Sequence, residues 1–430
     1  MFNTSSKALP LKRINTVAGD DVINLAEHSQ AHIISGTATG AAAGDKVTVT
    51  IGGQTYTTVL DAAGNWSVGV PASVISGLSD GTVTVTASVT DAAGNTGTGT
   101  HNVTVDTGLP SVSFSAISGD NVLNAVEKGQ DLSVSGTSAN LAEGTVVTVT
   151  LNGKNYTATT AADGTWSLTV PAADLAGLGQ ANYTLNATAT NGVGNSVSNT
   201  ANLLVDTALP TVTINTVAGD NVINAAEVAA GQTLSGTVAN AEAGNTVTVT
   251  IGGNSYTATV QSDLTWSVNV PESVLTALGN GDLTVSASVT NGHGNTGAGE
   301  REIVIDASLP GLRIDTVAGD DVINSIEHGQ NLIITGSSEG LATGAALTVT
   351  VNGKTYAATV LADGTWTAAI PAADVSALNA GTIAVTVEGQ SAAGNPVSIS
   401  HDVKVDLAAV AISINPIASD DVINAAEKGT

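Results

Sequence analysis

Carboxylates recur along this chain at fixed spacing, and they are the residues whose type and pattern could do chemistry. The segment from Gly19 to Glu27, Gly-Asp-Asp-Val-Ile-Asn-Leu-Ala-Glu, returns every 100 residues, and so does an aspartate first met at Asp106. These positions hold nearly half of the 37 acidic residues. Carboxylates this close together would repel one another and raise their own pKa values. A calcium ion, which takes six to eight oxygen ligands in proteins, would remove that cost.

The sequence therefore predicts calcium as the cofactor, with oxygen ligands from every copy. Magnesium is less favoured because it keeps most of its water shell. The expected ligands are Asp20, Asp21, Asn24, Glu27, Asp106, Asp120, Glu127, Asn191, Asp206, Asp220, Glu227, Asp306, Asp320, Asp321, Glu327, Asp406, Asp420 and Asp421. A second interpretation stays open for Asn24 and Glu27, because Asn-x-x-Glu is also the capping box of a short helix. The two roles are compatible.

No arrangement of side chains indicates catalysis. The sequence has no cysteine, so it has neither a disulfide nor a thiolate metal site. None of its six histidines is paired with a serine and an aspartate in a recurring or unique pattern. The glycine-containing turns lie between expected strands and do not open helices, which argues against phosphate binding. Since a catalytic site is seldom needed four times in a row, we expect no enzyme activity.

Composition narrows the class of partner. The 37 acidic and 11 basic residues give a formal net charge of −26, which excludes a surface for the phosphate backbone of nucleic acids. Apolar residues make up 42% of the chain, enough to build cores. No apolar run reaches about 18 residues, so we expect no membrane insertion of this region. Residues 1–13 lack the apolar stretch of a secretory signal, so any export signal is expected elsewhere.

The chain is an internal repeat with a period of 100 residues. Trp66 and Tyr56 each recur three more times at that spacing, and Pro110 recurs at 210 and 310. A period of this length suits an autonomous domain. We expect a tail at 1–9, four repeats at 10–109, 110–209, 210–309 and 310–409, and the start of a truncated fifth repeat at 410–430. A chain that stops inside a repeat is most simply part of a longer array.

Within each repeat the pattern is that of strands. Residues 46–51 and 82–89 alternate apolar side chains with Thr or Ser, and Gly- or Asn-containing turns separate the runs. The first repeat is expected to hold seven strands, at 13–17, 31–37, 46–51, 55–60, 66–70, 82–90 and 97–106. This predicts an all-β fold, a tandem array of immunoglobulin-like sandwiches forming an extended rod. Pro71–Leu78 is expected to form a short helix, and Tyr56 and Trp66 to lie in the core.

Strand order then places the acidic segments at one pole of each sandwich. Successive loops alternate between poles, so the 19–27 segment and the end of the last strand should lie next to the following repeat. The loops around Asp163 and Asn191–Asn195 should face them from the second repeat. Each junction between neighbouring repeats would thus collect oxygen ligands.

Several recurring motifs resemble a known family. They are D-T-x-L-P, V-A-G-D-D-V-I-N-x-x-E, S-G-T, V-T-V-T-I-G-G, D-G-T-W and A-G-N, spread over residues 10–430. They resemble the bacterial Ig-like extender repeats of giant RTX adhesins. The resemblance implies an extracellular, calcium-stiffened spacer on the bacterial cell surface, exported by type I secretion and serving adhesion and biofilm formation. It transfers calcium ligation best to Asp106, Asp206 and Asp306 and to Asp20, Asp120, Asp220 and Asp320.

Two functions of different classes follow. In the first, we expect a monomeric spacer whose partners are calcium ions and its own neighbouring repeats. In the second, the repeats themselves bind a surface glycan or a partner protein. Aromatic residues, which such binding modules usually expose, are 3% of the chain. The spacer is therefore the favoured prediction.

Overall fold

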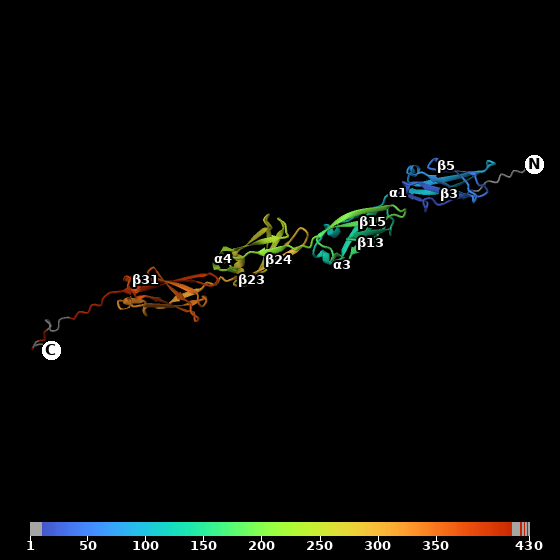
Figure 1. The fold of residues 1–430 in the computed structure, drawn as a ribbon. Helices are drawn as coiled ribbons and strands as arrows, with labels where there is room; N and C mark the ends of the chain where they lie inside the picture. Colours follow the sequence, from blue (N-terminus) through green and yellow to red (C-terminus); the bar gives the residue numbers. More distant parts are fainter. Residues whose placement is uncertain (1–10, 415–421, 424, 426–427, 429–430) are drawn as a thin grey trace, which may run out of the picture. The chain divides into compact units, whose positions relative to one another are not determined.

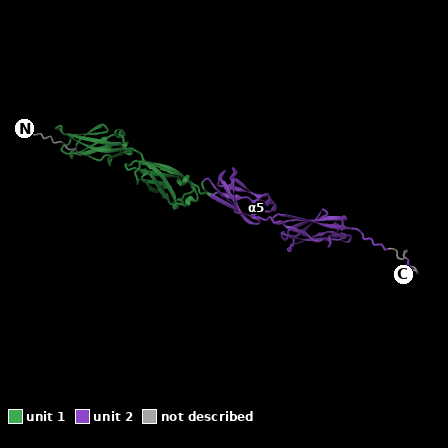
Figure 2. Ribbon diagram, turned by 180° about the vertical axis from the view of Figure 1, so that it is seen from behind, with its two compact units in different colours: residues 1–209, 293–295 green, residues 210–292, 296–430 purple. Residues whose placement is uncertain are grey.

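The structure, a computed structural model, describes residues 11–414, 422–423, 425 and 428. Asp420 and Asp421, two of the predicted ligands, lie outside the described residues. The chain divides into two compact units (Figure 2): unit 1 extends to Leu209 and includes His293–Asn295, and unit 2 holds the remainder. The same order of strands occurs twice in each unit, with short helices between them (Figure 1).

Unit 1 contains the first two copies of the repeat. The elements of the first copy are β1 (Leu11–Ile14), β2 (Val22–Asn24), α1 (Leu25–His28), β3 (His32–Ala38), β4 (Lys46–Ile51), β5 (Gln54–Val59), β6 (Asn65–Val70), α2 (Ala72–Ile75), β7 (Gly81–Thr90) and β8 (Thr96–Asp106). Those of the second copy, with 3-10 helices written η, are β9 (Ser111–Phe114), η1 (Ile117–Gly119), β10 (Val122–Leu123), η2 (Glu127–Gly129), β11 (Leu132–Ala139), β12 (Val146–Leu151), β13 (Lys154–Thr159), β14 (Thr165–Val170), α3 (Ala172–Leu175), β15 (Ala181–Thr190) and β16 (Ser196–Val205).

Unit 2 repeats this order. The third copy contains β17 (Thr211–Ile214), β18 (Val222–Ile223), α4 (Ala225–Ala230), β19 (Gln232–Ala239), β20 (Thr246–Ile251), β21 (Asn254–Thr259), β22 (Thr265–Val270), α5 (Glu272–Leu278), β23 (Gly281–Thr290) and β24 (Thr296–Ile305). The fourth contains β25 (Gly311–Ile314), β26 (Val322–Asn324), η3 (Glu327–Gly329), β27 (Leu332–Glu339), β28 (Ala346–Val351), β29 (Lys354–Thr359), β30 (Thr365–Ile370), α6 (Ala372–Val375), β31 (Gly381–Gln390) and β32 (Pro396–Asp406).

Each copy is a sandwich of two sheets. In the first copy a three-stranded sheet has the order β1-β3-β6 and a five-stranded sheet the order β2-β8-β7-β4-β5. All pairs are antiparallel except β2 with β8, which is parallel. Equivalent strands give the same two sheets in the other three copies. The predicted tandem of immunoglobulin-like sandwiches is confirmed.

The structure differs from the sequence prediction in the 19–27 segment. None of the seven expected strands includes this segment, but it contains the short strand β2, whose Ile23 is fully buried. Three residues are too few for an alternating pattern to show, and the parallel partner lies about 80 residues away in the chain. The short helix after Pro71 is present as α2, with Pro71 as its N-cap and Ile75 buried.

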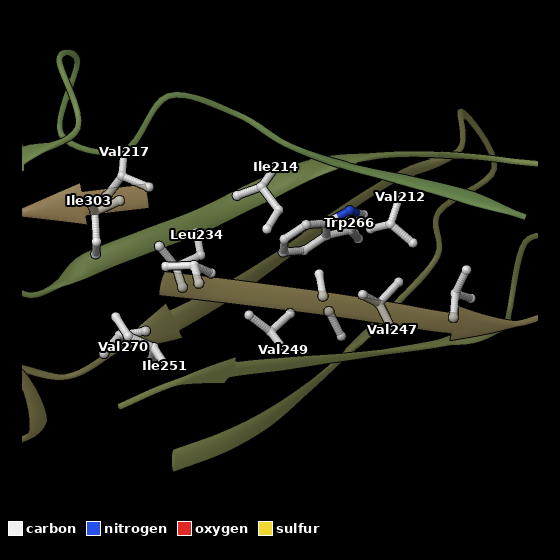
Figure 3. Close-up of a cluster of buried hydrophobic side chains, with 14 of the residues drawn as sticks. Val212, Ile214, Val217, Leu234, Val247, Val249, Ile251, Trp266, Val270 and Ile303 are labelled. Atoms are coloured by element: carbon white, nitrogen blue, oxygen red, sulfur yellow. The ribbon is translucent and has the colours of Figure 1, made fainter. Parts of the chain in front are cut away.

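The four tryptophans lie in the cores. Trp66, Trp166, Trp266 and Trp366 are exposed by 3%, 2%, 1% and 0%, respectively. Figure 3 shows Trp266 among Ile214, Val212 and other aliphatic side chains of both sheets. The core prediction for tryptophan is confirmed, and a ring buried to this extent has no face free for a sugar. Tyr56 is half-buried and packs against the same kind of core.

The recurring Ser-Gly-Thr motif is explained by this tryptophan. Gly236 lies opposite Trp266 in the β19–β22 register. A Cβ atom on Gly236 would come within 1.8 Å of the Thr213 carbonyl oxygen and 2.8 Å of the tryptophan ring. Only glycine lets the ring and the first strand of the copy approach the backbone this closely.

Candidate functional site

Asp20 and Asp21, the first two predicted ligands, hold a tight turn. Asp20 Oδ1 accepts a hydrogen bond from the Val22 N–H at 3.0 Å. Asp21 has a φ of 66°, and its Oδ1 accepts from the Val17 N–H at 2.8 Å. The other three copies repeat both bonds. Aspartate and asparagine tolerate this left-handed conformation better than most residues because their short side chains bond the local backbone.

The second turn residue, Asp21 in the first copy, varies together with the position of His101 on the last strand. Asp21 Oδ1 lies 2.6 Å from His101 Nε2, and the Asp321 and His401 atoms repeat the contact at 2.8 Å. The intervening copies carry Asn121 and Asn221 instead. Partial burial opposes ionisation of Asp21, but the bonds from His101 and the Val17 N–H hold its pKa below the usual value. Asp21 therefore has a structural role in the turn.

The next two predicted ligands form a reciprocal capping box. The Glu27 N–H donates to Asn24 Oδ1 at 3.1 Å, and the Asn24 N–H donates to Glu27 Oε2 at 3.1 Å. The same pair of bonds occurs in the other three copies. The capping interpretation is thus correct, and a second carboxylate oxygen of each glutamate remains outside these two bonds.

Strand β2 brings this box to the end of the last strand. In the parallel β2–β8 register Asn24 lies opposite Asp106, as Asn324 lies opposite Asp406 in the β26–β32 pair. Asp106 Oδ1 accepts from the Gly108 N–H at 3.0 Å, which turns the chain into the next copy. The acidic segment and the last-strand aspartate therefore gather at one pole, as the loop order predicted.

A buried asparagine joins neighbouring copies. Asn195, in the loop before β16, accepts the Leu25 N–H on Oδ1 at 2.8 Å and donates from Nδ2 to the Asp106 carbonyl at 2.9 Å. Asn295 makes the same two bonds to Ala125 and Asp206, and Asn395 makes them to Ala225 and Asp306. We call Asn195, Asn295 and Asn395 the junction asparagines. They are exposed by only 3%, 1% and 0%.

The last residue of this loop, rather than the first, makes its shorter hydrogen bonds across the junction. Asn191 was the predicted ligand, yet its contact across the junction is a 3.5 Å bond from Nδ2 to the Gly108 carbonyl, longer than those of Asn195. The available signal was the repeat itself: the fifth loop residue is asparagine in all four copies, whereas the first is Asp91, Asn191, Asn291 and Ser391. The loop at Asp163, also expected to face the junction, uses Asp163 Oδ1 for Thr165 in its own turn.

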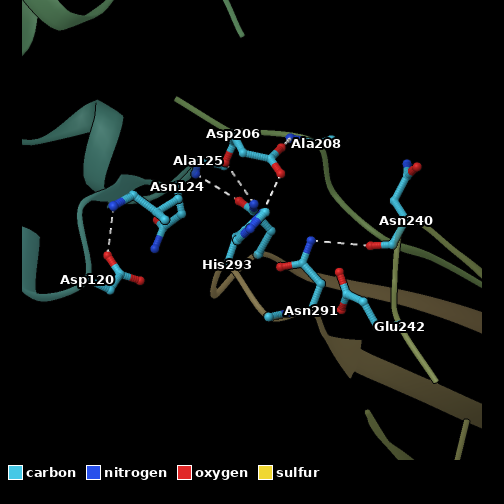
Figure 4. A network of polar contacts seen from close by, with 12 residues as sticks. Asp120, Asn124, Ala125, Asp206, Ala208, Asn240, Glu242, Asn291 and His293 are labelled. Atoms are coloured by element: carbon cyan, nitrogen blue, oxygen red, sulfur yellow. Dashed lines mark hydrogen bonds and ion pairs between the residues drawn. The ribbon is translucent and has the colours of Figure 1, made fainter. Parts of the chain in front are cut away.

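The last-strand aspartates differ in their surroundings. We call Asp106, Asp206 and Asp306 the junction acids, because each precedes a linker to the next copy. Each accepts a backbone N–H two residues on, at 3.0, 3.0 and 3.1 Å. Asp206 also contacts His293 (Figure 4), and the Ala208 N–H and then His293 hold the pKa of Asp206 below its usual value. In the fourth copy Lys404 lowers the pKa of Asp406 in the same way.

The donor set at these poles fits calcium in chemistry. The described residues contain no cluster of three or more His, Cys, Asp or Glu side chains. The first pole offers two carboxylates, of Glu27 and Asp106, each with one oxygen outside the backbone bonds described above. Amide and carbonyl oxygens of the same turn are hard ligands of the same kind, and water completes many calcium shells. Glu27 and Asp106 are the residues that would hold the ion.

A family model and several solved structures are similar to this chain. A model of the bacterial Ig-like domain matches residues 24–107. The chain is similar, at 34% identity, to a calcium-stabilised adhesin with which an Antarctic bacterium binds ice; the match covers 93% of this chain and 99% of that one, with a TM-score of 0.40. A 1.5-MDa bacterial ice-binding adhesin gives 31% identity over 70% of this chain and 98% of its own, with a TM-score of 0.39.

A third similarity is to a tetra-tandem repeat from the extending region of a large adhesion protein. Identity is 29%, over 90% of this chain and 99% of that one, with a TM-score of 0.37. No protein of curated function matches the chain. Across the described residues, no helix has the length and apolar character needed to cross a membrane.

Proposed function

This chain belongs to the family of tandem bacterial Ig-like repeats found in adhesins, and from that premise we propose that it is the extender of an extracellular bacterial adhesin. Its role is to hold an adhesive tip away from the cell surface. The observation that carries the proposal is the repeated junction asparagine, whose buried side chain bonds both the capped segment and the last strand of the preceding copy at three successive junctions.

Calcium is proposed as the ion that stiffens these junctions. When bound, it would supply positive charge that offsets the Glu27 and Asp106 carboxylates. The protein's own residues prepare the place: the capping box orients Glu27, the β2–β8 pair sets Asn24 beside Asp106, and Asn195 fixes the linker backbone. A chain with a net charge of −26 gains further from a divalent cation at its acidic poles.

Finer points follow from the same proposal. We propose four domains at 10–109, 110–209, 210–309 and 310–409, each around one of the four hydrophobic cores. The chain would act as a monomeric spacer without enzyme activity, in a cell-surface adhesin of the RTX type exported by type I secretion and used in biofilms. The tryptophans are buried in all four copies, so nothing favours a sugar-binding role over the spacer.

Small-angle scattering of the full chain tests the proposal. Extracellular modules often bind calcium with Kd values of about 10⁻⁴–10⁻³ M, so calcium should be scanned through the millimolar range against a chelator. We expect the maximum dimension to be larger in calcium, and Asp106→Asn to lose part of that increase. The matched control is Asp163→Asn, which changes an aspartate held in its own turn. Equal dimensions with and without calcium, together with no bound ion, would refute the stiffening role.

A further inference from the structure

One junction acid, Asp206, already accepts a hydrogen bond from a side chain of the next copy. Asp206 Oδ1 accepts the Ala208 N–H at 3.0 Å, and Asp206 Oδ2 lies 2.5 Å from Nδ1 of His293 (Figure 4). Because a carboxylate can only accept, the imidazole Nδ1 must carry the proton of this bond. A hydrogen bond to an ionised acceptor is of the charge-assisted kind.

The histidine is peculiar to this junction. The equivalent loop positions hold Ala93, Val193 and Ala393, which cannot donate a hydrogen bond from the side chain. Within the described residues, Asp106 and Asp306 have no ion-pair partner. The three junctions share the same backbone hydrogen bonds. They differ in the group that contacts the second carboxylate oxygen of the junction acid.

His293 is held in place by the backbone around it. Two residues further on, Asn295 bonds the Ala125 N–H at 2.8 Å and the Asp206 carbonyl at 2.9 Å. These bonds fix the loop that carries the imidazole directly against the acid. A cation approaching Asp206 Oδ2 would have to displace an N–H donor whose hydrogen carries positive charge, a cost that Asp106 and Asp306 do not impose.

We propose that His293 takes the place of calcium at the Asp206 junction, so that calcium binds at the Asp106 and Asp306 junctions only. This inference rests on the proposed calcium-stiffened extender. It makes the middle junction independent of calcium: an imidazole–carboxylate pair closes it in the presence or absence of the ion. On removal of calcium, the chain would loosen at its first and third linkers and keep its second.

The number of calcium ions bound per chain tests whether His293 excludes calcium from the Asp206 junction. Calcium per chain is measured by equilibrium dialysis of the full protein for the parent, for His293→Val and for Val193→His. The two substitutions exchange residues that the chain itself uses at equivalent positions, so both should fold, which circular dichroism checks. We expect His293→Val to bind one ion more than the parent, and Val193→His to bind one ion fewer.

Proteolysis in chelator gives a second readout. Linkers 106–110 and 306–310 should be cut in the parent while 206–210 is spared, and His293→Val should expose all three. A parent that binds calcium, with both variants unchanged in ion number and cleavage, overturns this inference and leaves the extender proposal standing. A parent that binds no calcium at all overturns both.

Discussion

At the scale of single residues, each copy contains a close contact of a glycine with the core tryptophan. A Cβ atom on Gly36 would lie 2.3 Å from the Arg13 carbonyl oxygen and 2.5 Å from the Trp66 ring. Gly36→Ala should therefore push apart β1 and Trp66, and overpacking of this kind typically costs about 1–3 kcal/mol. Chemical denaturation of the full chain, followed by tryptophan fluorescence, measures the loss.

Gly69 provides the matched control. It lies in the neighbouring strand β6, a Cβ atom there would meet nothing within 4 Å, and the other copies carry Thr169, Asn269 and Ala369. Gly69→Ala should leave the free energy of unfolding unchanged or raise it by roughly 0.4–1 kcal/mol. Equal destabilisation by both substitutions would show that loss of glycine in a strand, rather than crowding of Trp66, is the cause.

The sequence predicted which residue types lie at the site better than it predicted the hydrogen-bond partners of each side chain. The spacing of acids in the sequence identified Asp106 and Glu27, because a period of 100 is visible in a single chain. It could not show that Asp21 is engaged by His101, since that contact joins residues 80 apart in the sequence. Nor could it show that Asn195 crosses the junction and Asn191 mainly shapes its own loop. Such choices depend on backbone geometry that side-chain type does not reveal.

At the scale of elements, strand β2 connects the core to the site. Ile23 is fully buried, while the next residue, Asn24, belongs to the capping box beside Asp106. Truncation to Ile23→Ala should cost about 2–5 kcal/mol of unfolding free energy. Because it frees β2 from β8, we also expect weaker calcium binding, although no proposed ligand is changed. Denaturation and calcium titration of the same variant test the two effects together.

A control substitution at a buried valine on another strand separates the loss of stability from the loss of calcium binding. Val47 in β4 is also fully buried, and β4 pairs with β5 and β7, away from the β2–β8 pair. Val47→Ala should lower stability and leave the calcium titration as in the parent. If Ile23→Ala behaves in the same way, β2 is only a part of the core and has no role in placing the acids.

At the scale of the whole molecule, four cores share one chain. The core residues fall into four separate clusters, from Ile14–Val105 in the first copy to Ile314–Val405 in the last. The stability of a repeat array is approximately the sum of terms within each repeat and terms between nearest neighbours. Junction bonds such as those of Asn195 link copies without merging their cores, so each copy keeps a core of its own.

Tension on the chain ends reaches each copy at its first and last strands. In the first copy the chain enters at β1, which pairs with β3, and leaves from β8, which pairs in parallel with β2 and antiparallel with β7. Pulling therefore strains the hydrogen bonds of these pairs. Among the strained bonds is that from the Thr104 N–H to the Asp21 carbonyl, at 2.9 Å. Stretching single molecules should therefore give four similar unfolding events. Removing the core aromatic with Trp166→Ala, at a typical cost of about 3–5 kcal/mol, should weaken one event and leave three. Two larger events would instead mean that copies unfold in pairs, and a gradual extension would mean that the cores do not unfold as units.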